Sequence, residues 1–70
     1  MNIEQFVICI SNDGYPASLE PRKIYRLLSE EPSEMLRVVD ESGEDYLYPE
    51  FLFVRVELSD AARKAIDLAA

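Results

Sequence analysis

Short apolar runs alternate with clusters of turn-forming residues along the first half of the chain. Residues 6–10 are β-branched or aromatic apart from one cysteine, as in a strand whose two faces are both buried. Residues 11–21 collect serine, asparagine, aspartate, glycine and two prolines, which predicts a long loop because residues before proline avoid the α region. A second strand is predicted over residues 23–28, and the charged residues and proline of residues 29–33 are expected to end it.

The middle of the chain has the pattern of an antiparallel hairpin followed by one more strand. Residues 35–40 and 45–48 are short apolar runs on either side of a tight turn, in which Gly43 can adopt the positive φ angle that such a turn requires. Residues 49–51 form a brief turn. Residues 53–58 then alternate between two sets of side chains, which predicts a fifth, half-buried strand.

The last segment has the spacing of an amphipathic helix over residues 60–69. Ser59 supplies an N-cap oxygen, and Asp60 places an acid in the first turn. Side chains of opposite charge four residues apart can pair along it. Because a helix this short is marginal alone, we expect its stripe of small apolar side chains to pack on the rest of the chain, with a contact to another subunit as the alternative. The pairs are Asp60 with Lys64 and Arg63 with Asp67, and the stripe consists of Ala62, Ala65, Ile66 and Ala69.

From residue 23 onward, this order of elements resembles the Src-homology-three (SH3) fold. In that family a strand that ends in an aromatic or aliphatic residue and proline leads into a single 3₁₀ turn, and residues 48–54 are similar to this segment. The loop of residues 11–21 takes the place of the family's first long loop. The resemblance implies a mainly β chain with one SH3-like domain over residues 1–70: a five-stranded barrel over about 5–58, followed by the short C-terminal α-helix.

The chain also resembles a set of short bacterial proteins of unassigned function. The likeness rests on residues 14–19 and on the stretch Asp-Glu-Ser-Gly-Glu-Asp-Tyr-Leu-Tyr-Pro of residues 40–49, and it implies no activity. Peptide-binding members of the SH3 family grip polyproline ligands with a tryptophan and several tyrosines, and this chain has no tryptophan. Of the family's gripping positions, Pro49 is matched and Tyr15 is a second candidate, so recognition of a proline motif is not expected.

Composition places the chain among globular proteins of the cytoplasm. Hydrophobic residues make up 49% and charged residues 30% of its 70 residues, whereas disordered chains combine high charge with low hydrophobicity. The only cysteine, Cys9, lies in an apolar strand and is expected to be a buried free thiol, as suits a reducing compartment. The most apolar run is too short for a membrane span or a signal-peptide core.

The net charge of −7 and the lack of reactive side chains narrow the possible functions. An acidic surface repels phosphate backbones and anionic membranes, so nucleic acid is a disfavoured partner and no membrane is expected. With no histidine and no glycine-rich phosphate loop, we expect neither an enzyme nor a cofactor. Carboxylates crowd the hairpin tip, but their spacing matches no calcium loop, and we expect the tip to be solvated. They are Asp40, Glu41, Glu44 and Asp45.

Aromatic side chains are the most informative group, because a small barrel cannot bury all of them. Strand alternation places Tyr46 and Tyr48 on one face and Leu47 on the other, so the two tyrosines are either both exposed or both in the core. Tyrosine suits an interface, since its ring packs while its hydroxyl stays solvated. We therefore predict a non-enzymatic protein–protein interaction module with an aromatic and proline patch rimmed by acidic residues. Its binding residues are Tyr15, Tyr46, Tyr48, Pro49 and Phe51.

Two other functions stay open at the level of the sequence. One is a small nucleic-acid-binding barrel, whose basic residues would gather on one side despite the negative total. The other is an acidic decoy that occupies the nucleic-acid site of a basic protein. The partner is unidentified, and the chain is expected to be a monomer or a weak dimer. The basic set is Arg22, Lys23, Arg26, Arg37 and Arg55, and the acidic set is Glu30, Glu31, Asp40, Glu41, Glu44 and Asp45.

Overall fold

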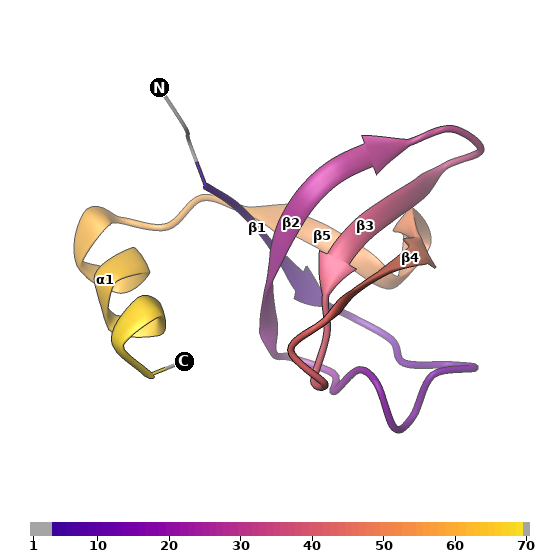
Figure 1. Cartoon of the computed structure of the whole chain (residues 1–70), viewed down its shortest axis with the longest axis horizontal. Helices are drawn as coiled ribbons and strands as arrows, with labels where there is room; N and C mark the ends of the chain where they lie inside the picture. The colour runs from indigo at the N-terminus through magenta and orange to yellow at the C-terminus, as the bar shows by residue number, and fades with distance from the viewer. Residues whose placement is uncertain (1–3, 70) are drawn as a thin grey trace.

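The computed structural model describes residues 4–69 as one antiparallel sheet of five strands with a short helix after it (Figure 1). The mainly β class and the C-terminal helix are therefore confirmed. In chain order, the elements are β1 (Gln5–Cys9), β2 (Ile24–Glu31), β3 (Met35–Val39), β4 (Asp45–Pro49), the 3₁₀ turn η1 (Glu50–Leu52), β5 (Phe53–Val56) and α1 (Asp60–Ala69). Among the residues described, no helix has the length and apolar character needed to cross a bilayer.

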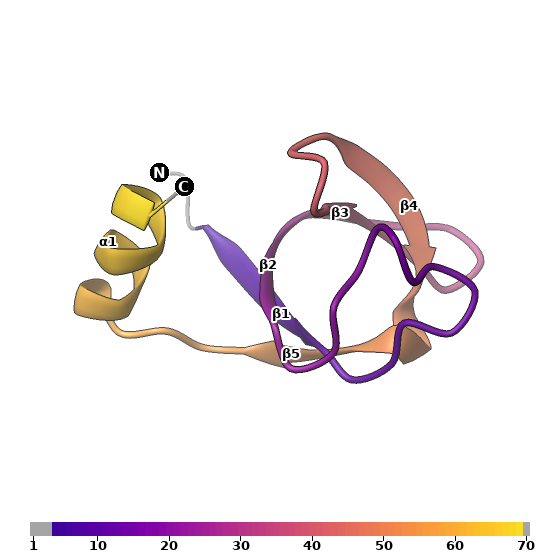
Figure 2. The same ribbon diagram turned by 90° about the horizontal axis from the view of Figure 1, so that it is seen from below.

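The sheet is curled but not closed. Its strands lie in the order β4-β3-β2-β1-β5, and β4 and β5 form its two edges, so the predicted closed barrel is not confirmed. Figure 2 shows the loop between β1 and β2 crossing the open side, near β4 and η1. There the amide of Ile10 donates to the carbonyl of Leu52 at 2.8 Å, and the amide of Glu41 donates to the carbonyl of Ser18 at 3.0 Å. The long loop therefore covers the gap that strand pairing leaves.

The second strand is longer than the sequence pattern predicts. It runs to Glu31, past its predicted end at residue 28, because these extra residues pair with β3. The register shifts between Leu27 and Ser29, an irregularity of the kind that bends a strand without ending it. The chain reverses only at residues 33–34, whose φ angles are 66° and 59°.

The remaining elements begin and end within about two residues of their predicted positions. The largest difference is at β5, which ends at Val56 because residues 57–59 leave the sheet and lead to α1. The brief turn predicted before β5 is the 3₁₀ turn η1, and the helix has its predicted bounds.

The core lies on the inner side of the curled sheet and beneath the long loop. Val7 and Cys9 of β1 face it and are fully buried, whereas Ile8 between them points to the other face and is half-buried. Ile10 is exposed, so the first strand is not buried on both faces along its whole predicted length. Cys9 is the buried free thiol that was predicted, and burial raises its pKa. The other core residues are Leu19, Tyr25, Leu27, Leu36, Val38, Tyr48, Leu52 and Phe53.

The first turn of α1 is capped as predicted. The hydroxyl of Ser59 accepts a hydrogen bond from the amide of Ala62 at 3.1 Å. Asp60 pairs with Arg63 at 2.6 Å, three residues along, instead of with the predicted partner four residues along. The predicted partner of Arg63, Asp67, has a side chain that lies outside those the structure describes.

The helix stands beside the sheet, near the start of β1, rather than across a sheet face (Figure 1). Of its predicted apolar stripe, Ala62 and Ile66 are half-buried and Ala65 is exposed, and the side chain of Ala69 lies outside the described part. The predicted packing of the whole stripe on the sheet is therefore wrong at Ala65. A charged side chain, Arg63, reaches the sheet and lines a hollow with Phe6 of β1.

Candidate functional site

Three of the five predicted binding residues meet in one hollow of about 510 Å³, which lies between the long loop and the β3–β4 hairpin. We call it the tyrosine hollow. Its lining residues are Tyr15, Ala17 and Ser18 from the loop, and Asp40, Glu41, Ser42, Tyr46, Leu47 and Tyr48 from the hairpin. The other two predicted residues are elsewhere: Phe51 lines a second hollow, and Pro49 is a half-buried member of the edge strand β4.

The two tyrosines of β4 differ in exposure, although alternation puts them on the same face. Tyr46 is 52% exposed, whereas Tyr48 is 3% exposed and belongs to the core. The long loop causes the difference, because the ring of Tyr15 packs edge-on against Tyr48 with 4.9 Å between ring centroids. The ring of Phe53 packs on Tyr48 as well, with 6.2 Å between ring centroids. The prediction that both rings share one environment is wrong, and Tyr48 is a wall of the hollow rather than an exposed docking residue.

Asp40 is buried at the base of the hairpin instead of lying in a solvated tip. Its carboxylate accepts hydrogen bonds from the amide and hydroxyl of Ser42, at 2.8 and 2.5 Å, and from the hydroxyl of Tyr48 at 2.5 Å. Burial alone would raise the pKa of Asp40, but these bonds from Ser42 and Tyr48 hold it below the ordinary value. Burial and the same carboxylate raise the pKa of Tyr48 to about 12. The prediction of a wet carboxylate cluster is therefore wrong for Asp40.

Glu41 ties the hairpin to the start of β2. Its carboxylate accepts hydrogen bonds from the ammonium of Lys23 at 2.8 Å and from the hydroxyl of Tyr25. The hydroxyl of Tyr25 also accepts a hydrogen bond from the amide of Glu20 at 2.8 Å, which links it to the long loop. Lys23 and then Tyr25 hold the pKa of Glu41 below its usual range, and the bond to Glu41 raises the pKa of Lys23. Burial, followed by the contact with Glu41, raises the pKa of Tyr25.

The rim of the tyrosine hollow is open and largely apolar. Tyr46 and Leu47 are 52% and 41% exposed, and the hydroxyl of Tyr46 donates to Glu44 at 3.3 Å. The charge of Glu44 raises the pKa of Tyr46. The hollow therefore offers ring and aliphatic surface above polar groups that already have partners. Sequence reasoning missed Ala17, Ser18, Ser42 and Leu47. The exposed face of an edge strand was the signal available for Leu47.

The hollow is lined by carboxylate, hydroxyl and phenol groups as well as by apolar side chains. The carboxylate of Asp40 and the hydroxyl of Tyr48 are hydrogen-bonded to each other, and the pKa of Tyr48 is raised to about 12. Among the residues described, no group of three or more histidine, cysteine or acidic side chains is arranged to hold a metal ion. What the arrangement can do is receive an apolar side chain.

A second hollow of about 320 Å³ opens beside the 3₁₀ turn, and we call it the Phe51 hollow. Phe51 stands at its rim and is 72% exposed, more than any other large hydrophobic residue among those described. Its other lining residues are Val7, Glu34, Leu36, Glu50, Phe53 and Arg55. The predicted aromatic patch is therefore divided between two separate surfaces.

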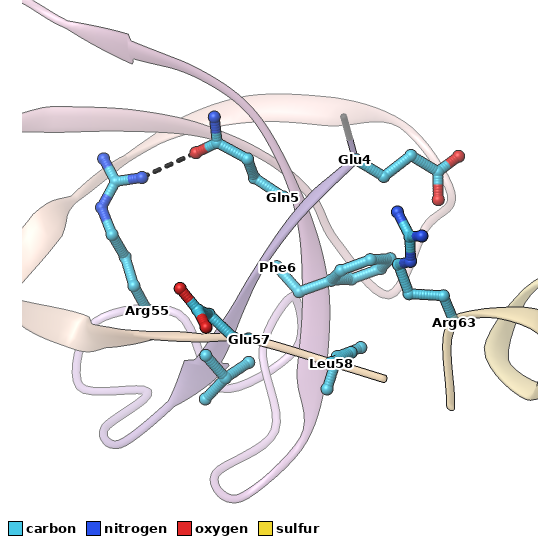
Figure 3. Close-up of a pocket in the computed structure, with 8 residues that line it drawn as sticks. Glu4, Gln5, Phe6, Arg55, Glu57, Leu58 and Arg63 are labelled. Carbon is cyan, nitrogen blue, oxygen red and sulfur yellow. Dashed lines mark hydrogen bonds between the residues drawn. The ribbon is translucent and has the colours of Figure 1, made fainter. Parts of the chain in front are cut away.

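A third hollow, of about 630 Å³, separates α1 from the start of β1 and the end of β5. Figure 3 shows Arg63 beside the ring of Phe6, with Glu4 close by, and Arg55 donating to the side chain of Gln5. The distance of that last bond is 2.7 Å. Charged and polar side chains line much of this hollow, and none of the predicted binding residues lies in it.

Basic side chains do not gather into a free cationic face. Lys23, Arg26, Arg37 and Arg55 each form an ion pair with a nearby carboxylate, and Arg22 occupies a turn position with a φ angle of 72°. Their partners are Glu41, Glu4, Asp45 and Glu30 respectively. These pairs also place cations beside part of the acidic set, at Glu41, Asp45 and Glu30.

Comparisons of the chain with protein-family models, with curated proteins and with solved structures found no match. Its function is therefore inferred from its own residues and their arrangement.

Proposed function

We propose that this chain is a non-enzymatic protein-binding module with an SH3-like arrangement, and that the tyrosine hollow is its docking surface. The 3₁₀ turn that follows Pro49 and leads into β5 supports the likeness to the SH3 fold. The curled five-stranded antiparallel sheet supports it too.

The observation that carries the proposal is an exposed apolar rim above a floor whose polar groups are paired. Tyr46 and Leu47 are each about half exposed, and covering them removes apolar surface from water at about 25 cal/mol per Å². In the wall of the hollow, the buried carboxylate of Asp40 already has hydrogen-bond partners, so a ligand that covers it leaves no newly unsatisfied group there. Binding of an apolar side chain is therefore favoured by its burial.

The same contacts make the hollow rigid before a ligand arrives. Glu41 connects the hairpin to the long loop through the hydrogen bond that its amide donates to the carbonyl of Ser18, and through the hydroxyl of Tyr25, which bonds to both Glu41 and Glu20. A preformed site loses less conformational entropy on binding. The partner we infer is a protein segment that presents an aliphatic or proline side chain to Tyr46 and Leu47, without the polyproline grip that a tryptophan provides.

Amide chemical-shift mapping tests the proposal. The ¹⁵N-labelled chain is titrated with fractions of an extract from the source organism, and we expect shift changes at residues 15–18, 40–42 and 46–47. A fraction that binds is then tested against Tyr46→Ala and against Val54→Ala, a control that removes a similarly exposed apolar side chain from β5. Weakened binding for Tyr46→Ala alone supports the proposal. Shifts that avoid these residues, or equal effects of the two variants, contradict it.

A further inference from the structure

The Phe51 hollow is separate from the tyrosine hollow and has a different character. No residue of the long loop lines it. Its walls include Val7, Leu36 and Phe53, which come from β1, β3 and β5 and are all buried core residues. Phe51 stands above these apolar walls with most of its ring in solvent. The hollow therefore has core side chains at its base, charged side chains around it and an exposed aromatic ring at its rim.

Two carboxylates flank this ring without cations to balance them. The amide of Glu50 donates to the carbonyl of Glu34 at 2.9 Å, which fixes the two residues next to each other. Both are exposed, and within residues 4–69 neither has an ion-pair partner. Arg55 also lines the hollow, but its guanidinium is bound to Glu30 and Gln5. The rim therefore carries negative charge that the rest of the described chain leaves uncompensated.

We propose that the Phe51 hollow binds an arginine side chain from a basic segment of a partner protein. The apolar stem of the arginine packs against Leu36 and Phe53, and its guanidinium lies over Phe51 within reach of Glu34 and Glu50. Arginine fits better than lysine because its planar guanidinium stacks on aromatic rings and donates to carboxylates in a fork. A volume of about 320 Å³ lies at the lower end of ligand-site sizes, as suits one side chain rather than a whole peptide.

The net charge of the whole chain also favours a basic partner. A net charge of −7 attracts a basic segment and speeds its encounter with the surface. This proposal does not depend on the tyrosine hollow, because no residue lines both hollows.

A pair of short peptides tests the proposal on the full chain. One peptide carries a central Leu-Arg-Leu in a glycine and serine background, and the other carries citrulline in place of the arginine, which keeps the shape and removes the charge. In amide-shift titrations at about 20 mM salt, we expect the arginine peptide to bind about fivefold more tightly and to shift residues 34, 50 and 51. We expect this preference to fall toward parity at about 500 mM salt.

Variants of the chain test the contribution of the Phe51 ring and the contribution of the two carboxylates separately. Phe51→Ala should weaken binding of the arginine peptide by about threefold or more, since the cation loses its ring. Glu34→Gln combined with Glu50→Gln should abolish the preference for arginine over citrulline. Asp13→Asn combined with Glu57→Gln makes the same change in net charge away from the hollow and should keep that preference. All these side chains are exposed, and the amide spectrum of each variant reports whether the fold is retained.

Several results would overturn the proposal. These are equal binding of the two peptides at low salt, no binding of either, shifts confined to the tyrosine hollow, or an equal loss in the two double variants. A failure of the tyrosine hollow to bind any partner leaves this prediction intact, because the two experiments report on different residues.

Discussion

Replacing Tyr48 with phenylalanine removes one hydroxyl from the core and leaves the ring in place. In the native chain that hydroxyl donates to Asp40 Oδ2 at 2.5 Å, and Asp40 is only 6% exposed. A hydrogen bond to a charged group contributes about 1.5–3 kcal/mol to stability. Because Ser42 still donates to the same carboxylate, we expect Tyr48→Phe to cost about 1.5–2 kcal/mol at neutral pH, near the lower end of that range.

Tyr46→Phe is the matched control for this substitution. Its hydroxyl also donates to a carboxylate, that of Glu44, but at 3.3 Å and in solvent, so we expect no measurable change in stability. Urea unfolding followed by circular dichroism measures both free energies of unfolding. In a domain of this size, the loss expected for Tyr48→Phe lowers Tm by about 6–16 °C.

The pH dependence of this effect gives a second check. The pKa of Asp40 lies below its ordinary value in the fold, so its stabilising contribution is present above that ordinary value and is lost as the pH falls through the folded-state pKa. Without the Tyr48 hydroxyl, the pKa of Asp40 moves upward, and the difference between variant and native chain should shrink below roughly pH 4. Equal stability of the two phenylalanine variants, or a difference that does not change with pH, would refute the reasoning.

Other perturbations test the remaining contacts. Glu41→Gln weakens the acceptor shared by Lys23 and Tyr25, so we expect a loss of about 1 kcal/mol and faster amide hydrogen exchange in residues 11–21; unchanged exchange would contradict the proposed tie. The pKa of Tyr48 is raised to about 12 in the fold, so its protonated form stabilises the fold and this stabilisation is lost as the pH rises from about 10 to about 12. We therefore expect the Tm to fall above about pH 10. A constant Tm between about pH 10 and 12 would argue against this reasoning. Glycine adopts a positive φ angle more readily than other residues, so Ser33→Gly, at a φ angle of 66°, should stabilise the chain by about 0.5–1 kcal/mol. Gly43→Ala, at a φ angle of 83°, should destabilise it by about 1 kcal/mol. Opposite signs of the two changes in urea unfolding would refute this account of the turns.

Local patterns determine most of the strand positions in this chain. The apolar runs and the glycine of the hairpin turn are short-range signals, and Gly43 has the positive φ angle that the pattern predicts. The end of β2 could not be predicted in this way. Its last residues are charged or polar and partly exposed, and they extend the strand because their main chain pairs with β3. Such a strand has no apolar signature of its own.

The arrangement of the candidate site depends on contacts between segments that are far apart in the sequence. The alternation of side chains along one strand does not predict such contacts. Tyr46 and Tyr48 occupy equivalent positions in the pattern, yet only Tyr48 is covered by Tyr15. Asp40 is buried within the hairpin, where the hydroxyl of Tyr48 and the amide and hydroxyl of Ser42 bond to its carboxylate. The sequence therefore predicted three residues of the tyrosine hollow but not which of them a partner can reach.

Both free edges of the sheet are poor templates for pairing with a further strand. The amide of Asp40 donates to the carbonyl of Glu44, so residues 44, 46 and 48 direct their main-chain groups toward β3, and residues 45, 47 and 49 direct theirs outward. Pro49 belongs to the outward set and has no N–H to offer an incoming strand. At the opposite edge, β5 is only 4 residues long and presents the charge of Arg55. A stack of copies joined edge to edge therefore meets a missing donor on one side and a short, charged strand on the other.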